Sequence, residues 1–365
     1  MAEIPSAQQL PDWLRELPSN TKLWIDTDIG NDIDDVLALI ISMLLFGRER
    51  IVGISTTFYR PDNKARIAKL LLSEYHWDHI PVHAGVGIYD VEKDGHLLTS
   101  KYGPWPPQFK TPWDPASVSS KEALAYKQLF AGKWEGIKVE PNTAVEALRA
   151  AVNKYGSELV ILSIGFPTNV AEVWDDIVKN KINRIVIMGG WFEDPNGNVL
   201  RLGYNTVIDL SASRKLLQQK DIPVLIVSSE FCKKFAITKT QYDELQEKGH
   251  RVGGRAISKA ICEDMKVWME GKVQKGSEGL IHIGDPIAAY LTYRPESISK
   301  TEPVNIEIHD YVEGVHMFHP DCKNYITVTK VDQSNIHVVK DVYDAPAMVK
   351  GLLELIHRSF DWKKF

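Results

Sequence analysis

Cysteine is scarce in this sequence, and its spacing indicates neither a disulfide framework nor a zinc site. The 365 residues include three cysteines, Cys232, Cys262 and Cys322, and none of them forms a C-x-x-C pair. The sequence also contains no N-x-S/T acceptor for N-glycosylation, a motif that indicates surface loops of secreted proteins. An odd number of widely spaced cysteines favours a reducing compartment. We therefore expect a cytoplasmic protein whose cysteines are small, buried, apolar residues.

Long apolar runs and an excess of basic charge are also absent. No stretch approaches the roughly 18 apolar residues of a membrane span, and residues 1–20 lack the basic start and apolar centre of a signal peptide. The formal net charge is −5 at pH 7, and no run of Lys and Arg is suited to follow the phosphates of a nucleic acid. We expect neither a membrane nor a nucleic acid as partner.

The composition that remains is that of an ordinary globular protein, with 44% hydrophobic and 25% charged residues. Short runs rich in Val and Ile alternate with segments of helical periodicity such as 143–155. The runs are 22–26, 51–56, 80–85, 158–163, 184–189 and 223–229. Apolar strands separated by helices predict an α/β fold, in which an open and mainly parallel sheet carries helices on both faces.

The pattern contains no repeat and no clear boundary, so residues 1–365 are interpreted as one domain. Residues 1–20 form an N-terminal extension, and 86–120, rich in Pro, Gly and aromatic residues, is expected to be a long loop over one end of the sheet. Three short runs in 304–339, followed by a helical pattern at 345–357, predict a β-ribbon and a closing helix. The helix at 34–46 is apolar on nearly every side, which predicts burial between sheet and neighbour or in a subunit contact.

The stretch LWIDTDIGNDIDDVLAL holds five aspartates within ten residues, which are Asp26, Asp28, Asp32, Asp34 and Asp35. The first two end the first strand, where open parallel sheets bind their ligands. The last two begin the following helix, where capping and the helix dipole explain one or two acids. Five repel one another unless a cation compensates them. Hard oxygen ligands on a flexible turn suit Ca²⁺, and Mg²⁺ less readily, but the glycine and glutamate spacing of an EF-hand is missing.

This stretch resembles the opening of the nucleoside hydrolase family of the inosine–uridine preferring type, a strand running into D-x-D-P-G-x-D-D and an apolar helix. The matching residues are Asp26, Thr27, Asp28, Gly30, Asp34 and Asp35. Ile29 replaces the usual proline, and the turn carries two additional residues. Either Asp32 or Asp34 therefore takes the ribose-binding place of the family, and we favour Asp34.

Later motifs follow in the order of that family and extend the resemblance over most of the chain. SIGFPTN at 163–169 resembles its G-P-L-T-N turn, in which Thr168 aligns, and IMGGWFEDPNGN at 187–198 resembles the strand and loop that end in Gly-Asn, here Gly197 and Asn198. GYNTVIDLSAS resembles E-F-N followed by D-P-E-A, with Asn205 aligned, and IHIGDPIAA resembles H-D-P-L-A, with Asp285 aligned. Gly203 stands where the family has a glutamate, and Gly284 stands where it has a histidine.

The resemblance implies the nucleoside hydrolase fold, a small-molecule nucleoside as substrate, a homodimer or homotetramer, and a role in purine or pyrimidine salvage. It implies that Ca²⁺ is held by Asp28, Asp35, the carbonyl of Thr168 and Asp285, with Asp28 also acting as general base. Hydrolysis of an N-glycosidic bond needs an activated water on one side of the sugar and charge relief at the departing base on the other. The substrate-binding residues that the resemblance implies are Asp34, Asn63, Asn198 and Asn205.

The sequence gives less information about the residues that would contact or protonate the departing base. With Gly284 in the histidine position, His282 is the candidate acid, although a lone histidine beside an apolar residue is more often structural. Four aromatic residues could stack on a base or serve as packing or lid residues, and these are Tyr102, Trp105, Trp113 and Trp268.

Two alternative functions are compatible with parts of the sequence. The opening LWIDTDIG also resembles a haloacid dehalogenase-like phosphatase, but residues 287–290 lack the later carboxylate of that family, and Asp34 and Asp35 have no role in it. The glycines at positions 203 and 284 favour a second alternative, a catalytically weak ligand-binding protein on the hydrolase scaffold.

Overall fold

The structure is a computed structural model. It describes residues 10–14, 16–30, 33–58, 61–86, 89–91, 97–100, 130–134, 136–192, 203–207, 209–251, 256–274, 281–308 and 326–361.

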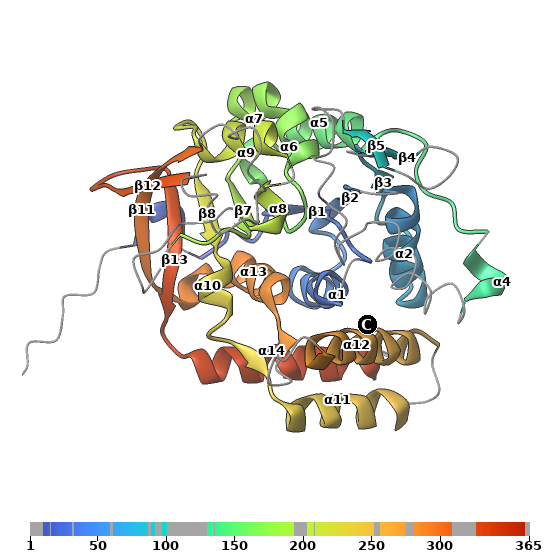
Figure 1. The fold of residues 1–365 in the computed structure, drawn as a ribbon. Helices are drawn as coiled ribbons and strands as arrows, with labels where there is room; N and C mark the ends of the chain where they lie inside the picture. The colour runs from blue at the N-terminus through green and yellow to red at the C-terminus, as the bar shows by residue number, and fades with distance from the viewer. Residues whose placement is uncertain are drawn as a thin grey trace, which may run out of the picture.

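A nine-stranded sheet runs through the centre of the molecule in the order β12-β11-β13-β8-β7-β6-β1-β2-β3 (Figure 1). Its strands are β1 Lys22–Thr27, β2 Ile51–Thr56, β3 Val82–Ala84, β6 Leu159–Ser163, β7 Arg184–Met188, β8 Val224–Val227, β11 Ile298–Ile308, β12 Ile326–Lys330 and β13 Ile336–Val342. β11 runs antiparallel to its neighbours β12 and β13, and the other described pairs in this sheet are parallel. The predicted mainly parallel α/β sheet is confirmed.

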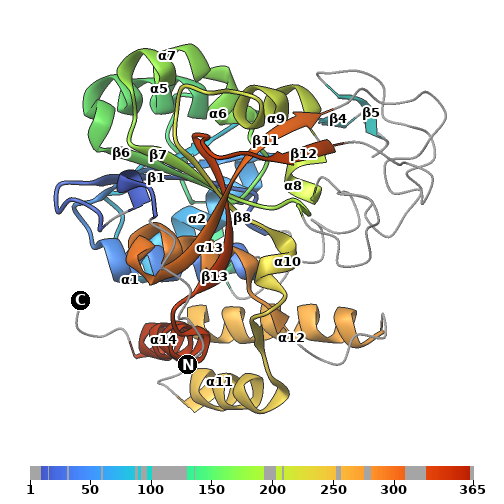
Figure 2. The same ribbon diagram turned by 90° about the vertical axis from the view of Figure 1, so that its left-hand side faces the viewer.

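Helices cover both faces of the sheet, as Figure 2 shows. One face carries α5 Ala144–Tyr155, α6 Thr168–Glu172, α7 Trp174–Asn180 and α9 Leu210–Leu217, and the other carries α1 Asp34–Phe46, α2 Pro61–Glu74 and α13 Gly284–Tyr293. Beyond α1 and α13 lie α11 Lys239–Arg251, α12 Ala256–Gln274 and α14 Ala345–Phe360. The short helices are η1 Asp12–Leu14, α4 Ala131–Trp134, η2 Gly156–Glu158, α8 Tyr204–Val207, α10 Ser229–Cys232 and η3 Pro295–Ser297. None of the described helices is both long and apolar enough to cross a membrane.

The buried residues form two hydrophobic cores, one on each face of the sheet. In β1, Leu23 and Ile25 belong to the core under α1 and α13, and Trp24 belongs to the core under α5 and α7, because successive strand residues point to opposite faces. α1 contributes to the first core along almost its whole length and packs against α13, α14 and β1. Its apolar surface is therefore buried between the sheet and neighbouring helices, which is the first of the two alternatives that its sequence allows.

Three sequence predictions concern parts of the chain outside the central strands, namely the C-terminal β-ribbon, the loop 86–120 and the extension 1–20. The C-terminal ribbon is part of the main sheet, since β11 pairs with β12 and β13, and the closing helix is α14. Within the expected loop 86–120, β4 Tyr89–Val91 and β5 Leu97–Ser100 form a short antiparallel pair, whereas the sequence predicted no regular element there. Residues 101–120 lie outside the described part. Within the extension 1–20, the ring of Trp13 packs edge-on against His337.

The strand order changes direction beside β1. From β1 the chain builds outward through β2 and β3, then returns to place β6 on the other side of β1 and continues through β7 and β8. The loops that follow β1 and β6 thus leave the sheet in opposite directions and open a crevice between the carboxyl ends of these strands, the usual ligand site of open α/β sheets. The aspartate-rich turn after β1 and the Gly165–Thr168 turn after β6 both lie at this crevice.

Candidate functional site

Asp26, near the end of β1, is a fully buried carboxylic acid that holds three elements together. Its Oδ1 accepts hydrogen bonds from Oγ of Ser55 at 2.5 Å and from Nδ2 of Asn169 at 2.8 Å. Burial raises the pKa of Asp26 to about 7 against the lowering effect of these bonds, and the charge of Asp28 raises it further. Because Oδ1 of Asn169 also accepts the N–H of Val86 at 2.9 Å, this network links β1 and β2 to α6 and to the chain after β3.

Thr27, the last residue of β1, connects the turn to the first helix. Its hydroxyl donates a hydrogen bond to Oδ1 of Asp35 and accepts one from the N–H of Ile29 at 3.1 Å. A proline at position 29 would have no N–H to donate. Ile29, at the position where the resemblance has a proline, therefore supplies a hydrogen bond that fixes the hydroxyl pointing at Asp35.

A buried lysine holds the same turn from the side of α2. The side chain of Lys64 is only 3% exposed, and its Nζ donates to the carbonyl oxygens of Asp28 at 2.7 Å and Ile29 at 3.3 Å. On the other side, Gly165 packs so closely that a Cβ there would lie 2.6 Å from the backbone N of Asp28. The backbone of Asp28 is thus fixed between α2 and the turn after β6, and its side chain is 4% exposed.

Three carboxylates meet where the N-termini of α1 and α13 face each other. Ligand oxygens of Asp34, Asp35 and Asp285 all lie within 4.8 Å of one another, and Oδ2 of Asp34 accepts the N–H of Asp285 at 3.5 Å. Both helices start at these residues, so the positive ends of two helix dipoles favour the negative charges. Two oxygens bound to one Ca²⁺ at about 2.4 Å lie at most about 5 Å apart. The spacing and the oxygen donors fit such a cation.

Thr168 begins α6, and its side chain is tied to a buried aspartate. Its Oγ1 donates to Oδ2 of Asp209 at 2.7 Å, and Oδ1 of Asp209 caps α9 by accepting the N–H of Ala212 at 2.9 Å. Both Thr168 and Asp209 are almost fully buried. Asp209 therefore fixes the start of α6 relative to α9.

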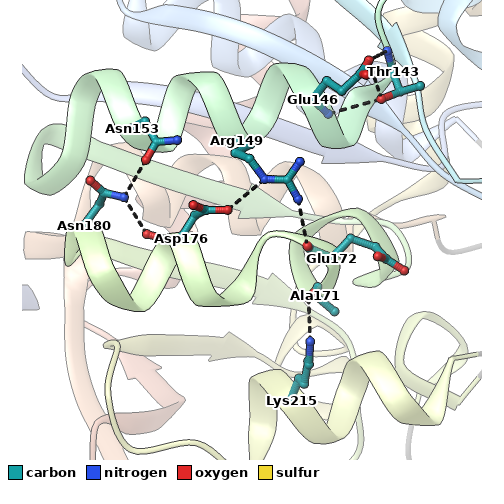
Figure 3. A network of polar contacts seen from close by, with 9 residues as sticks. All are labelled: Thr143, Glu146, Arg149, Asn153, Ala171, Glu172, Asp176, Asn180 and Lys215. Carbon is teal, nitrogen blue, oxygen red and sulfur yellow. Dashed lines mark hydrogen bonds and ion pairs between the residues drawn. The ribbon is translucent and has the colours of Figure 1, made fainter.

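The other end of α6 is fixed by cations from two neighbouring helices (Figure 3). Nζ of Lys215 donates to the carbonyl oxygen of Ala171 at 3.2 Å, and Nη2 of Arg149 to that of Glu172 at 3.5 Å. Arg149 also forms an ion pair with Asp176 of α7 at 2.8 Å. Positive side chains at the last carbonyls of a helix satisfy groups that have no partner within the helix. The short α6 is thus held at both ends, which limits the freedom of Thr168.

Asn205 of α8 bridges the ends of β6 and β7. Its Nδ2 donates to the carbonyl oxygens of Ile164 at 2.6 Å and Met188 at 3.3 Å, and it is half-buried. The N–H of Ile164 in turn binds the carbonyl of Asp26 at 2.8 Å. The amide of Asn205 is therefore oriented by backbone groups next to the strand that carries Asp28.

The two glycines that replace family side chains lie in closely packed surroundings. A Cβ at Gly203 would lie 2.4 Å from the backbone N of Gly190, and a Cβ at Gly284 would lie 2.2 Å from Cε of Met188. At neither position is there open space in the direction of a side chain. Both glycines therefore stand where a larger side chain requires a neighbouring group to move.

Some of the predicted site residues lie in the described part of the chain, and others lie outside it. Asp34, Asp35 and Asp285 lie together, and Asp28, Thr168 and Asn205 follow the ends of β1, β6 and β7. Asn63 lies in the first turn of α2, directly before Lys64. The backbone of His282 is in β10 Ile281–His282, which pairs with β9 Ala236–Ile237, but its side chain is outside the described part. Asp32, Asn198, Tyr102, Trp105 and Trp113 also lie outside it, and Trp268 lies on α12 against the core.

Several residues that shape the site were not singled out from the sequence. Their contacts are long-range, and they comprise Ser55, Lys64, Asn169, Met188 and Asp209. Two of them stand in motifs that match the family, Asn169 in SIGFPTN and Asp209 in GYNTVIDLSAS. Nothing in the local pattern around Lys64 distinguishes it from an exposed helical lysine, so its burial could not be inferred.

Comparison with known proteins identifies related folds. The model of a family described as inosine-uridine preferring nucleoside hydrolase matches residues 23–350. A purine-preferring ribonucleoside hydrolase from Gardnerella vaginalis superposes with a TM-score of 0.67 at 20% identity, over 93% of this chain and 99% of that one. An inosine-uridine preferring nucleoside hydrolase from Bacillus anthracis gives 0.64 at 15% identity, over 94% and 99%. A plant nucleoside hydrolase gives 0.63 at 17% identity, over the same shares. No curated protein matches by sequence.

Proposed function

Because the chain belongs to the inosine-uridine preferring nucleoside hydrolase family and is an N-ribosyl hydrolase by that membership, we propose that it cleaves ribonucleosides to ribose and free base in a Ca²⁺-dependent reaction. The observation that carries the proposal is the meeting of Asp34, Asp35 and Asp285 within 4.8 Å at the crevice beside β1. Such proximity of three carboxylates is unfavourable without a cation. The alternative of a haloacid dehalogenase-like phosphatase finds no support in the matches described above.

Asp28, Asp35, Asp285 and the carbonyl of Thr168 are the proposed ligands of the cation. When bound, Ca²⁺ would lower the pKa of a coordinated water and orient ribose hydroxyls. Thr27 orients Asp35 through its hydroxyl, and Asp209 restrains the segment that carries the Thr168 carbonyl. Residues that orient metal ligands in this way usually affect the affinity for the metal as well as the geometry of its ligands.

Asp28 is the proposed general base. It stands at the crevice with its backbone held by Lys64 and Gly165, so its carboxylate can take a proton from the attacking water without a large rearrangement. As the water attacks C1′, the bond between C1′ and the base nitrogen breaks, and positive charge develops on the sugar. The negative charges of the surrounding aspartates favour that charge.

Asp34 and Asn205 are the proposed contacts to the 2′- and 3′-hydroxyls. The amide hydrogens of Asn205 are used by two backbone carbonyls, which leaves its Oδ1 to accept from a sugar hydroxyl. Asn198 on the 5′ side, Asn63 at the ribose and His282 as acid for the leaving group complete the proposed site. We also propose that residues 1–365 form one domain, that the protein is cytoplasmic and serves nucleoside salvage, and that it assembles as a homodimer or homotetramer.

The test is incubation of the purified protein with a panel of natural nucleosides and with 4-nitrophenyl riboside, with free ribose as the readout, with and without a calcium chelator. We expect ribose release that the chelator stops and added Ca²⁺ restores. Release that is indifferent to the chelator contradicts the metal site. Tight nucleoside binding without any turnover would instead support the alternative of a catalytically weak ligand-binding protein.

A further inference from the structure

The start of α13 is a corner of the site where a side chain would displace the end of a neighbouring methionine. Gly284 is buried and precedes Asp285 of the carboxylate cluster. A Cβ at this position would lie 2.2 Å from Cε and 3.4 Å from Sδ of Met188. Any larger residue at 284 therefore requires the thioether of Met188 to move.

A second sulfur lies near the carbonyl oxygen of the same glycine. Sγ of Cys232, from α10, is 3.9 Å from the carbonyl oxygen of Gly284, and the residue is buried. Burial raises the pKa of the Cys232 thiol, and the charges of Asp34 and Glu230 raise it further. The thiol therefore stays neutral and is a poor proton donor at physiological pH. The described neighbours of Gly284 thus include a thioether and a thiol.

Met188 also places this corner next to the proposed sugar site. Its carbonyl oxygen accepts from Nδ2 of Asn205 at 3.3 Å, while its side chain covers Gly284, the neighbour of Asp285. A sugar held by Asn205 and the carboxylate cluster thus has the Met188 thioether beside it.

The charge around this corner is predominantly negative. Asp28 follows β1 at the crevice, and Asp34, Asp35 and Asp285 form the cluster beside it. These four negative charges exceed the two positive charges of the proposed Ca²⁺ and the one of Lys64, which contacts the turn. A site lined with carboxylates raises the local concentration of cations and disfavours anions. A base that departs as an anion is therefore opposed here, both by the field and by the sulfur-lined corner.

We propose that this site prefers ribonucleosides whose base already carries a positive charge, such as N-ribosylpyridinium compounds and N7-alkylated purine ribosides. In this reaction the C1′–O bond to water forms while the C1′–N bond breaks, and its electron pair moves to the ring nitrogen and neutralises the ring. The proton of the attacking water passes to a site carboxylate and then to solvent. No donor to the leaving group is required, whereas a neutral purine needs one. The inference rests on the proposed hydrolase function and departs from it at one point, since it gives the leaving group no acid and so leaves His282 without that role.

The first experiment compares three probes on the wild-type protein with Ca²⁺, namely 4-nitrophenyl riboside, nicotinamide riboside and inosine. We expect kcat/KM for nicotinamide riboside to exceed that for inosine by at least about a hundredfold, the usual scale of a proton-donating group. Equal or faster cleavage of inosine overturns the inference. Cleavage of 4-nitrophenyl riboside but not of nicotinamide riboside overturns it and leaves the hydrolase function standing, and cleavage of none of the three overturns both.

The second experiment tests the corner itself. Gly284→His alone should gain no activity on inosine, because imidazole and thioether compete for the same space. Gly284→His combined with Met188→Ala should raise kcat/KM for inosine about tenfold or more and add a limb near the histidine pKa to its pH profile. The matched control combines Gly284→His with Met265→Ala, which removes a fully buried thioether from α12, away from Gly284. An equal gain in the control, or no gain in the test pair when both proteins are folded by circular dichroism, overturns the assignment of the corner.

Discussion

Thr27 and Asp35 are joined by a hydrogen bond that links the end of β1 to the first turn of α1, with the hydroxyl of Thr27 donating to Oδ1 of Asp35. The same hydroxyl accepts the N–H of Ile29 at 3.1 Å. Because it accepts from one side and donates to the other, its direction is determined. One oxygen of a proposed metal ligand is thus oriented by a side chain that does not itself touch the cation.

The first prediction concerns this hydroxyl. Thr27→Val keeps the shape of the side chain but removes the donor, so we expect Ca²⁺ affinity to fall by about tenfold or more, as for other groups that orient metal ligands. Thr27→Ser keeps the hydroxyl and should retain most of the affinity. Calorimetric titration of both variants with Ca²⁺ makes the comparison. Equal affinity in Thr27→Val and wild type would show that Asp35 needs no such support.

The second prediction concerns the carboxylates. Asp35→Ala and Asp285→Ala should each abolish tight Ca²⁺ binding, because each removes a charged oxygen from a hard cation that depends on several of them. Asp243→Ala is the matched control, since Asp243 pairs with Lys239 on the exposed face of α11. Its Ca²⁺ titration should equal that of wild type. An unchanged titration in either cluster variant counts against the site.

The alternating strands and helices and the position of the acidic turn could be predicted because they rest on local pattern. Runs such as 184–189 are apolar on both faces, and β7 is buried on both faces accordingly. The aspartates at the end of β1 lie at the crevice because strand ends in a parallel sheet share one edge. These features require only the period of the sequence and the rules of sheet assembly.

The support of the site could not be predicted, because it depends on residues that meet only after folding. Asn169 reaches Asp26 across 143 positions and Lys64 reaches Asp28 across 36. The packing of Met188 against Gly284 likewise has no local signal, since methionine at the end of a buried strand is ordinary core composition. In these cases the backbone trace of α2, α6 and β7 decides which side chains touch.

The third prediction concerns the buried ammonium of Lys64. Lys64→Met keeps the length and apolar stem but removes the donor to the carbonyls of Asp28 and Ile29. We expect the free energy of unfolding in urea to fall by about 1.5–3 kcal/mol, the usual contribution of a hydrogen bond to a charged group. Lys350→Met, on the exposed face of α14, should change it by less than about 0.5 kcal/mol. Similar effects of the two variants would mean that the turn is held by other contacts.

The fourth prediction concerns pH. Burial lowers the pKa of His337 below its usual 6.5, and the ring lies between Oγ1 of Thr301 at 2.9 Å, the carbonyl of Ser334 at 3.1 Å and the edge of Trp13. At a pH between the pKa of His337 in the folded chain and its pKa in the unfolded chain, His337 binds a proton in the unfolded chain but not in the folded one. The contribution of His337 to the free energy of unfolding is therefore fully present above about pH 6.5 and is lost as the pH falls toward the pKa of His337 in the folded chain.

Urea denaturation at several pH values between about 5 and 8 measures this dependence. His337→Gln should flatten the slope of the unfolding free energy below about pH 6.5 without removing it, because burial also lowers the pKa of His83 and His357. An unchanged slope in this variant would assign the acid sensitivity to other groups. Lys239→Gln, at an exposed position, serves as the control for a polar substitution elsewhere.

The fifth prediction concerns Asp28 and separates catalysis from binding. At saturating Ca²⁺ and with 4-nitrophenyl riboside, Asp28→Asn should lower kcat by at least about a hundredfold, the usual scale of a positioned general base, while KM changes less. Asn205→Ala should impair both kcat and KM, because ribose contacts position the substrate and strengthen in the transition state. The aryl leaving group needs little protonation, so the comparison is insensitive to the donor at the base. Cleavage by Asp28→Asn at the wild-type rate would show that another group takes the proton of the attacking water.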